Sequence, residues 1–557
     1  MTPVNRGFLL PALIAALALG ACNFAPHYER PQSDTPGKFK EAAPSAHANA
    51  QGWKIAEPKD ALARGNWWEI YHDTQLNELE ERVVKSNQTV VAAEANYRSA
   101  RALLGEAQSA LFPTVSAAPS VIRSRSSAAI ASGGSSGSTS SGASAGSGSG
   151  GGGGTGPHTY FTLPLEASYE VDLWGSVRNS VAQSSFTAQA SAENLQAVLL
   201  STQSTLAQTY FALRATDEQR RILDTTLADY EASLHLVRAL YNNGIASEED
   251  LAEADTQLDS AEAQATDLGV ARAQFEHALA VLIGVPPAAF SVSVRPFNSA
   301  LPTVPVGVPT DLLERRPDIA AAERQVASAN AGIGLARAAY FPNLTLSASG
   351  GFEALNLTKL LDWPNRIWSV GPSIAQTVFD GGLRRAENAQ ARAVYDASVA
   401  TYRQTVLSAF QSVEDNLASL RILSTEVTQQ HKAAVAAQHE VELSVVRYQN
   451  GLDSYVNVIT AQNAFLQNRL AELQIQLRRV TATVELVSNL GGGWDASQLK
   501  RTENMALNPP GASRNGEAPQ ENAGPGIPNP PPLPGGIKQP DDIIKQNAED
   551  MAPPAAP

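Results

Sequence analysis

Two short stretches, Tyr241-Asn242-Asn243-Gly244-Ile245-Ala246-Ser247 and Tyr448-Gln449-Asn450-Gly451-Leu452-Asp453-Ser454, repeat one pattern 207 positions apart. The same offset also pairs Gly175 with Gly382 and Gly284 with Gly491, and it needs no gap over 110 residues. A match of this length at one fixed offset indicates an internal duplication.

The duplication extends upstream at a second offset. A shift of 229 places residues 92–113 on residues 321–342 with 11 of 22 positions identical, and both stretches end in Phe-Pro. The offsets differ by 22 residues, and the almost pure Gly/Ser segment 131–156 lies where the first copy is longer. We interpret that segment as a flexible loop inserted into one copy.

Each copy predicts one very long helix. Residues 175–242 and 382–449 contain no proline, and 68 helical residues would extend about 100 Å. The Asn-Gly pairs would end these helices, because glycine tolerates a positive φ. The chain is then expected to return as helices 248–283 and 455–490. Residues 311–341 would continue the return path, and a helix is expected to run to each Phe-Pro, where proline ends it.

Two extended segments per copy are predicted between the helices. Residues 161–171 alternate apolar and polar side chains, as do residues 343–349 and 368–378. Alternation alone fits a half-buried soluble sheet equally well. Strands of this length also suit a tilted membrane crossing, and four of them cannot close a barrel. We therefore expect a mainly α chain with a small β part, closed by oligomerisation.

Composition excludes several classes of protein. The chain has 557 residues, 17% of them charged, and a formal net charge of -14. Its mean hydropathy of -0.18 argues against a polytopic helical membrane protein. The acidic balance argues against nucleic acid as a partner. A single cysteine excludes a disulfide framework and a multi-cysteine metal site.

That cysteine lies at the end of an export signal. Arg6 precedes an apolar stretch, and Leu19-Gly20-Ala21-Cys22 matches a bacterial lipobox, so residues 1–21 are predicted to be a lipoprotein signal peptide. Cys22 would carry diacylglycerol and an acyl group, and no other cofactor is expected. Asn23 after the cysteine favours the outer membrane. The alternative is an ordinary signal peptide with an incidental cysteine.

The predicted organisation follows from these segments. Residues 22–72 form a lipid-anchored N-terminal segment and part of an equatorial region. The first repeat spans 73–284, a Pro-rich connector spans 285–310, and the second repeat spans 311–496. Residues 497–557 form a Pro-rich tail that we predict to be disordered.

Five motifs in this order resemble those of the TolC-type outer-membrane efflux factors, within them the NodT-like lipoprotein branch. The resemblance covers residues 19–496 and rests on these stretches: Pro26-His27-Tyr28-Glu29-Arg30-Pro31; Asn66-Trp67-Trp68 with Asp73; Tyr169-Glu170-Val171-Asp172-Leu173-Trp174-Gly175; Leu312-Leu313-Glu314-Arg315-Arg316-Pro317-Asp318-Ile319; and Leu490-Gly491-Gly492-Gly493-Trp494.

The resemblance implies a homotrimer in the outer membrane of a Gram-negative bacterium. Three chains would close a 12-stranded barrel that continues into a periplasmic α-helical barrel. A periplasmic adaptor and an inner-membrane pump, commonly of the resistance-nodulation-division type, would deliver small molecules to this passive duct. Exit of secreted proteins and a non-conducting coiled-coil scaffold remain alternatives. No catalytic motif is present, so an enzyme is not expected.

The family's functional positions map onto the two hairpin tips. Adaptor contacts are expected at Asn243, Gly244, Ser247, Asn450, Gly451 and Ser454. The expected periplasmic gate comprises Tyr448, Asp453, Val456, Asn457, Thr460 and Asp250.

Two of these gate residues have structural alternatives. Asn457 and Thr460 stand where relatives carry acids. Either three copies of Asp453 supply the acidic ring alone and raise one another's pKa, or the gate is more apolar than in relatives. Alternatively, Asp453 only solvates or caps the return helix. Asp250 either accepts a hydrogen bond from Tyr448 as a latch or belongs to ordinary helix N-terminal chemistry.

The remaining conspicuous residues are predicted to be structural. Arg315-Arg316-Pro317-Asp318 reads as a helix start rather than a binding cluster. Trp67, Trp68 and Trp494 are expected to pack the equatorial joint.

Overall fold

The computed structural model describes residues 23–33, 39–41, 66–125, 157–297, 301–302 and 316–492, all within one compact unit. The predictions for the signal peptide and Cys22, the Gly/Ser loop 131–156, Trp494 and the tail 497–557 lie outside these residues.

The duplicated helices are present in both copies. Helices α6 (Ser176–Asn242) and α10 (Leu383–Gln449) have 67 residues each. They return as α7 (Glu248–Leu282) and α11 (Tyr455–Asn489), of 35 residues each. Gly175 and Gly382 precede the long helices, with φ of +80° and +96°. Each predicted helix is therefore confirmed but shorter by one residue.

The helix predicted to run to the first Phe-Pro is α4 (Gln88–Ser109) and is confirmed. A separate helix, α3 (Thr74–Ser86), precedes it, because Asn87 adopts an extended backbone between the two. The Asn87 side-chain oxygen accepts hydrogen bonds from the backbone of Thr89 and Val90, 2.8 and 3.1 Å away. Its amide donates to the Leu282 carbonyl at 2.7 Å, so this corner caps the end of α7.

The helix over residues 311–341 is shorter than expected and lies elsewhere. It is α9 (Pro317–Ala338), with Pro317 in its first turn, and the Arg316 guanidinium bonds both Asp318 (2.7 Å) and the Asn489 carbonyl (3.0 Å). The predicted role of Pro317-Asp318 as a helix start is confirmed. The same contacts place the start of α9 at the end of α11, and not at the end of α7 as predicted. Helix α4 lies at the end of α7 instead.

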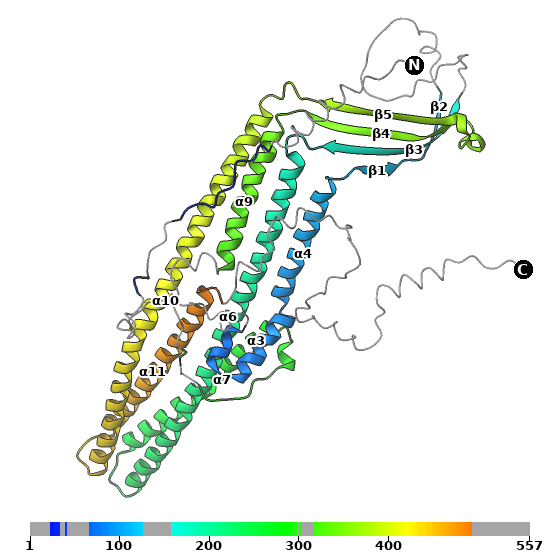
Figure 1. Ribbon diagram of the computed structural model, residues 1–557. Coiled ribbons are helices and arrows are strands. Elements are labelled where there is room, and N and C mark those ends of the chain that lie inside the picture. Colours follow the sequence, from blue (N-terminus) through cyan, green and yellow to red (C-terminus); the bar gives the residue numbers. More distant parts are fainter. Residues whose placement is uncertain are drawn as a thin grey trace, which may run out of the picture. The chain divides into compact units, whose positions relative to one another are not determined.

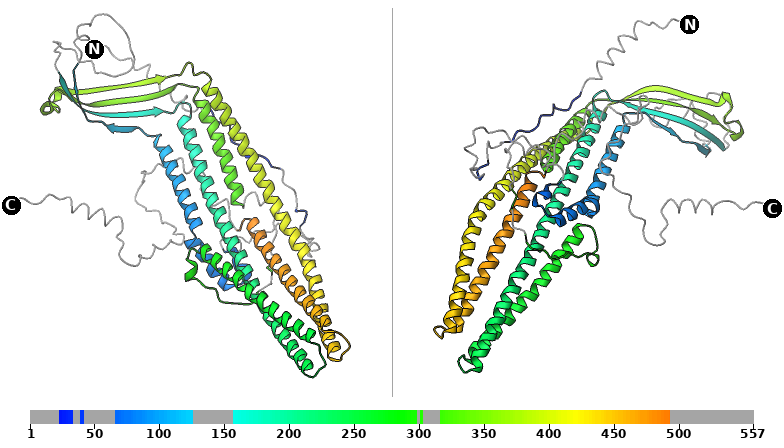
Figure 2. Two further views of the ribbon diagram at one scale, coloured as in Figure 1. Left: turned by 180° about the vertical axis from the view of Figure 1, so that it is seen from behind. Right: turned by 60° about the horizontal axis from the view of Figure 1, so that its bottom comes forward.

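The helices lie side by side (Figures 1 and 2). Near the strands the order is α10, α9, α6, α4, and near the hairpin tips it is α10, α11, α6, α7. Each 67-residue helix is thus accompanied by two stacked shorter ones. Within the described part of the chain, none of the helices combines the length and hydrophobicity that a membrane crossing requires.

The strands form one antiparallel sheet that is four strands wide. Its members are β1 (Thr114–Ala117), β2 (Ser120–Ser124), β3 (His158–Val171), β4 (Asn343–Ala354) and β5 (Arg366–Ala375). Both β1 and β2 pair with β3, which pairs with β4, which pairs with β5. No described strand pairs with the outer side of β1, β2 or β5, so the sheet has two open edges.

Strand lengths differ from the alternation pattern at two places. Strand β4 continues through Gly350-Gly351, where a Cβ on Gly351 would lie 2.2 Å from the Leu163 carbonyl oxygen. The two glycines have no side chain, so the alternation of apolar and polar residues stops there although the strand continues. At Gly351 only glycine leaves room for the backbone of β3. Strand β5 ends at Ala375, so Val378, which the alternation included, lies beyond it.

The register separates two faces of the sheet. Ala167 pairs with Ala348 and Tyr169 with Leu346 on the apolar face, while Glu166 pairs with Ser349 and Glu170 with Thr345 on the polar face. The two-faced sheet predicted from alternation is confirmed.

The largest apolar cluster lies at the joint between the stacked helices. Trp67 and Trp68 are buried there against side chains that include Leu206, Tyr210 and Leu279. The packing role predicted for these two tryptophans is confirmed.

A buried acid interrupts the packing of α6 on α9. Glu193 has 0% exposure, and neither carboxylate oxygen has a hydrogen-bond partner in the described residues. Burial raises its pKa to about 8, partly opposed by the positive charge of Arg324. Glu193 is therefore protonated at neutral pH.

Replacing Glu193 with glutamine is expected to stabilise the protein increasingly as the pH rises. The folded-state pKa is above the ordinary value, so native stability falls between about pH 4.3 and pH 8, by at most about 1.4 kcal/mol per unit. Glutamine removes this loss. Thermal unfolding at pH 5, 7 and 9 should show a gap between variant and wild type that widens up to pH 8. Identical pH profiles would contradict the assignment.

Candidate functional site at the helical hairpin tips

The two hairpin tips have the same backbone. Gly244 and Gly451 have φ of +71° and +69°, and a Cβ on either would meet nothing within 4 Å. Asn243 and Asn450 each donate a side-chain hydrogen bond of 2.7 Å to the carbonyl four residues earlier. At both tips glycine is thus needed for its φ alone.

A small apolar cluster joins the two hairpins behind the tips. The rings of Tyr448 and Tyr455 lie 5.2 Å apart between centroids, and they pack with Val237, Ala254 and Val458. These side chains come from α6, α7, α10 and α11. Tyr448, expected at the gate, is therefore buried in the contact between the hairpins.

Asp250 belongs to a capping box rather than to a latch in this protomer. The Ser247 hydroxyl accepts from the Asp250 amide at 3.0 Å, and the Asp250 carboxylate accepts from the Ser247 amide at 3.2 Å. The Tyr448 hydroxyl has no hydrogen-bond partner among the described residues. Burial, and secondarily the charge of Asp250, raise the pKa of Tyr448. The two groups are thus electrostatic neighbours without a hydrogen bond.

Asp453 is held by contacts within its own hairpin. Its carboxylate accepts from the Asn457 side chain, from the Ser454 amide at 3.1 Å and from the Arg447 guanidinium at 3.1 Å. The Asn457 hydrogen bond, followed by those of Ser454 and Arg447, lowers the pKa of Asp453. These contacts favour the charged form, whereas repulsion within a ring of three would oppose it. Ser454 itself makes no side-chain cap.

The other gate candidates share the uncovered side of α11. Val456 is 48% exposed, Asn457 and Thr460 are exposed, and the Thr460 hydroxyl donates to the Val456 carbonyl at 2.8 Å. Tyr455 and Val458 point into the cluster instead. The three candidates are therefore available to line a passage or contact another chain.

Three residues at the tips were not among the site residues predicted from the sequence. Ile245 and Leu452 occupy equivalent positions after the tip glycines and are 73% and 71% exposed. Their apolar character in both repeats was the available signal. Arg447 was missed because its pairing with Asp453 depends on how tightly the hairpin turns.

The two tips carry different charge. Helix α7 begins with Glu248, Glu249 and Asp250, whereas the first turn of α11 has no acid. Arg447 lies in the last turn of α10, and α6 has no basic residue there. The first tip is therefore acidic and the second nearly neutral. In the described part of the chain, no group of three His, Cys, Asp or Glu side chains could hold a metal ion.

Tyr448→Phe is expected to leave stability and channel conductance unchanged, because the hydroxyl it removes makes no hydrogen bond. Asp250→Ala, the comparison variant, should cost about 1 kcal/mol through loss of the capping box. Thermal unfolding and single-channel recording would measure both effects. A several-fold rise in conductance for Tyr448→Phe would show a latch that this protomer lacks.

The sequence matches a family model and proteins of known function over most of its length. The family model described as outer membrane efflux protein matches residues 79–285 and 308–492. The toluene efflux pump outer membrane protein TtgC of Pseudomonas putida is 30% identical over 488 residues, which are 87% of this chain and 96% of that protein. The outer membrane protein OprJ of Pseudomonas aeruginosa is 30% identical over 490 residues, covering 88% and 96%.

Solved structures match over most of the chain as well. The outer-membrane channel OprN superposes with a TM-score of 0.74 at 26% identity, covering 85% of this chain and 100% of that one. The open state of the Neisseria gonorrhoeae MtrE outer membrane channel gives a TM-score of 0.69 at 26% identity, covering 85% and 99%.

Proposed function

This chain belongs to the outer membrane efflux protein family, and from that premise we propose that it is the exit channel of a tripartite efflux pump. It is a passive duct in the outer membrane, through which small toxic molecules leave after an inner-membrane transporter has moved them. A periplasmic adaptor joins the two. A proton-driven pump of the resistance-nodulation-division type is the expected transporter.

The open sheet carries this proposal. A sheet four strands wide with unpaired edges at β1/β2 and β5 leaves backbone groups without partners, which native proteins avoid by closure or covering. The layer of helices also has two open edges, formed by α10 on one side and by α4 and α7 on the other. The resemblance to TolC-type outer-membrane efflux factors implies three copies, whose sheets joined edge to edge would make a 12-stranded barrel, so we assign a homotrimer.

The two faces of the sheet assign the inside and outside of that assembly. In a membrane barrel the apolar side faces lipid and the polar side faces the lumen. Glu166 and Glu170 therefore face the passage, and Tyr169 and Leu346 face lipid. Cys22, directly before the first described residue, carries the lipid anchor in this proposal. Multiple acyl chains hold a protein at a membrane stably.

The adaptor docks on the exposed tips, and its affinity should depend on Ile245 and Leu452. The double variant Ile245→Ser/Leu452→Ser removes the large apolar side chain from both tips, so adaptor binding should weaken at least tenfold with the hairpin fold unchanged. Surface plasmon resonance with the purified adaptor measures it. The matched Ile245→Val/Leu452→Ile variant should retain binding. Equal affinity in all three proteins would remove the tips from the docking site.

Drug susceptibility tests the function in cells. The full-length protein is produced, with its adaptor and pump, in a strain whose own outer-membrane efflux channels have been deleted. We expect minimum inhibitory concentrations to rise several-fold, and only when all three components are present. A correctly located protein that never raises resistance, or one that supports release of a secreted protein instead, would overturn the proposal.

A further inference from the structure

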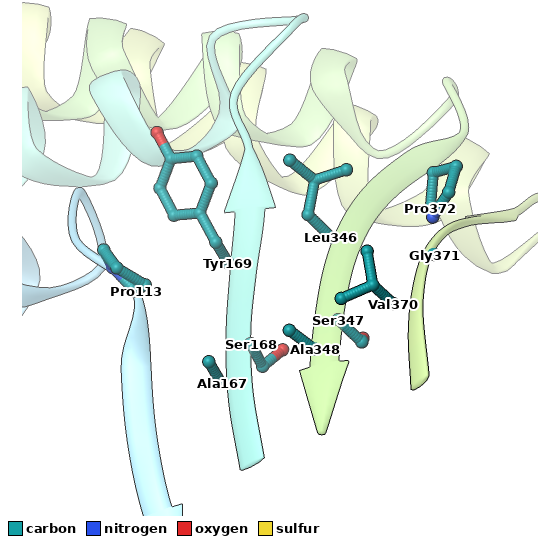
Figure 3. Close-up of a pocket in the computed structure, with 10 residues that line it drawn as sticks. All are labelled: Pro113, Ala167, Ser168, Tyr169, Leu346, Ser347, Ala348, Val370, Gly371 and Pro372. Carbon is teal, nitrogen blue, oxygen red and sulfur yellow. The ribbon is translucent and has the colours of Figure 1, made fainter. Parts of the chain in front are cut away.

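The apolar face of the sheet contains a groove of about 300 Å³ near its helix end (Figure 3). Its walls include Pro113, Tyr169, Leu346, Val370 and Pro372, which come from the start of β1 and from β3, β4 and β5. The groove is open to the surroundings of the sheet. Almost all of its lining is apolar, so it suits a hydrocarbon rather than a polar ligand.

Side-chain size in three successive rows creates this groove. Tyr169, Leu346 and Pro372 form one row, and Leu165, Gly350 and Trp368 form another, four residues further along the strands. The row between them consists of Ala167, Ala348 and Val370. Ala167 and Ala348 lie side by side, with Tyr169 and Leu346 before them and Leu165 and Gly350 after them, and no residue of the described chain fills the hollow above them.

An aromatic clamp lies where the strands meet the helices. The Phe24 ring stacks on Phe341 with centroids 4.4 Å apart and lies 6.3 Å from Trp174. The Trp174 indole donates to the Pro342 carbonyl at 2.8 Å, and Arg337 donates to the Phe24 carbonyl at 3.1 Å. Phe24 is thus fixed between the end of β3 and the beginning of β4.

The residues beside Phe24 are fixed as well. The Asn23 side-chain oxygen accepts from the Asn179 amide at 3.0 Å. A Cβ on Gly334 would lie 2.7 Å from the Cβ of Ala25, so only glycine lets the N-terminal segment lie this close to α9. Cys22 directly precedes Asn23, and its lipid therefore starts at this junction.

The groove is within reach of an acyl chain that starts there. Leu346 is five positions from Phe341, which is about 17 Å along a strand and about 12 Å in depth for a strand tilted by about 45°. One leaflet of the hydrocarbon core is about 15 Å deep. Ala348, seven positions from Phe341, lies about 17 Å deep by the same measure, so the hollow is at the level that the end of such a chain reaches.

We propose that an acyl chain of the Cys22 lipid packs into this groove over Ala167 and Ala348, and that the Phe24 clamp directs it there. The proposal rests on the lipid anchor assigned above. A tethered chain has a high effective concentration at the groove, so it competes with free phospholipid for this place. The lipid would then cover the sheet at one defined place in each protomer.

Photo-cross-linking tests this placement. Cells are fed a fatty acid that carries a diazirine near its end, and mass spectrometry first verifies the label on Cys22 of the purified full-length protein. After irradiation, cross-links should concentrate in residues 165–169 and 346–350. Ala348→Phe, which fills the hollow, should reduce these cross-links at least fivefold. Leu163→Phe, on the same face beyond the groove, should leave them unchanged.

A third variant distinguishes the contribution of the Phe24 clamp from that of the groove. Phe24→Ala should retain the label on Cys22 but spread the cross-links over the apolar face. Labelled protein that cross-links only to phospholipid, or equally with and without Ala348→Phe, would overturn the placement. Absence of lipid on Cys22 would overturn both the lipid anchor and the placement of its acyl chain. The proposed efflux function would then still be tested on its own, by whether the protein restores drug resistance.

Discussion

Arg214→Met is expected to destabilise the protein by about 3–5 kcal/mol, because it breaks a buried ion pair and leaves the Asp217 carboxylate with only one of its two arginine partners. The Arg214 side chain is 2% exposed. Its guanidinium bonds the Asp217 carboxylate at 3.0 Å, the Ser293 carbonyl at 2.8 Å and the Gln75 side chain, and it lies 4.8 Å from the centroid of the Tyr210 ring. It thereby connects α6, α3 and the connector.

The loss should extend beyond one pair. Asp217 also accepts from Arg272 at 2.8 Å, and Arg272 donates to the Val292 carbonyl at 2.7 Å. Both arginines thus fix the connector at the joint between the stacked helices. Without Arg214, the connector loses one of its two anchors and the Asp217 charge stays buried.

A matched control lies two turns away on the same helix. Arg221 pairs with Glu218 at 2.6 Å, but its side chain is exposed, so Arg221→Met should cost less than about 1 kcal/mol. Arg214→Met/Asp217→Asn should recover part of the loss, because it removes the buried Asp217 charge, while Arg272 keeps Glu276 as a partner. Thermal unfolding followed by circular dichroism measures all three. Equal midpoints for the two single variants would refute the importance of the buried network.

Gly284→Ala is the second change with a large expected effect. Gly284 has φ of +73°, and a Cβ there would lie 2.1 Å from the Ser86 carbonyl oxygen. Ser86 in turn donates to the Ile283 carbonyl at 2.8 Å. The backbone between α3 and α4 would have to leave the end of α7, which would open the joint around Trp67 and Trp68. We expect little or no assembled channel in the membrane.

Gly244 provides the control for Gly284. Its φ of +71° is nearly the same, but a Cβ there meets nothing. Gly244→Ala should therefore show only the cost of a left-handed conformation, about 1–2 kcal/mol, and should assemble. The amount of assembled channel on native gels, together with the midpoint of thermal unfolding, compares the two. A Gly284→Ala protein no less stable than Gly244→Ala would contradict the steric argument.

Much of the fold follows from local sequence signals. The Asn-Gly tips, the proline-free stretches and the Phe-Pro ends placed the long helices to within one residue, because each signal acts through nearby backbone geometry. The break at Asn87 was missed although asparagine is a common helix N-cap, because its competing partner, the Leu282 carbonyl, is almost 200 positions away. The stacking of α9 on α11 likewise depends on the distant contact between Arg316 and Asn489.

The site was predictable in part for the same reason. The tips and the exposed side of α11 follow from the repeat, and the capping box of Ser247 and Asp250 follows from their spacing. The Arg447–Asp453 pair required the turn geometry, and the unpartnered Tyr448 hydroxyl required the packing of four helices. Buried Glu193 and Arg214 gave no local signal, since the sequence around each is ordinary for a helix surface.

Conductance across a planar lipid bilayer is the most direct test of whether copies of this chain close into a water-filled passage. The purified, lipid-anchored protein should give discrete steps of uniform size. Arg447→Met/Asp453→Asn removes the ion pair at the second tip and shows whether these charges affect conduction. Protein that inserts as a stable oligomer but never conducts, even with these tip charges removed, would contradict the claim and leave a structural spacer as its role.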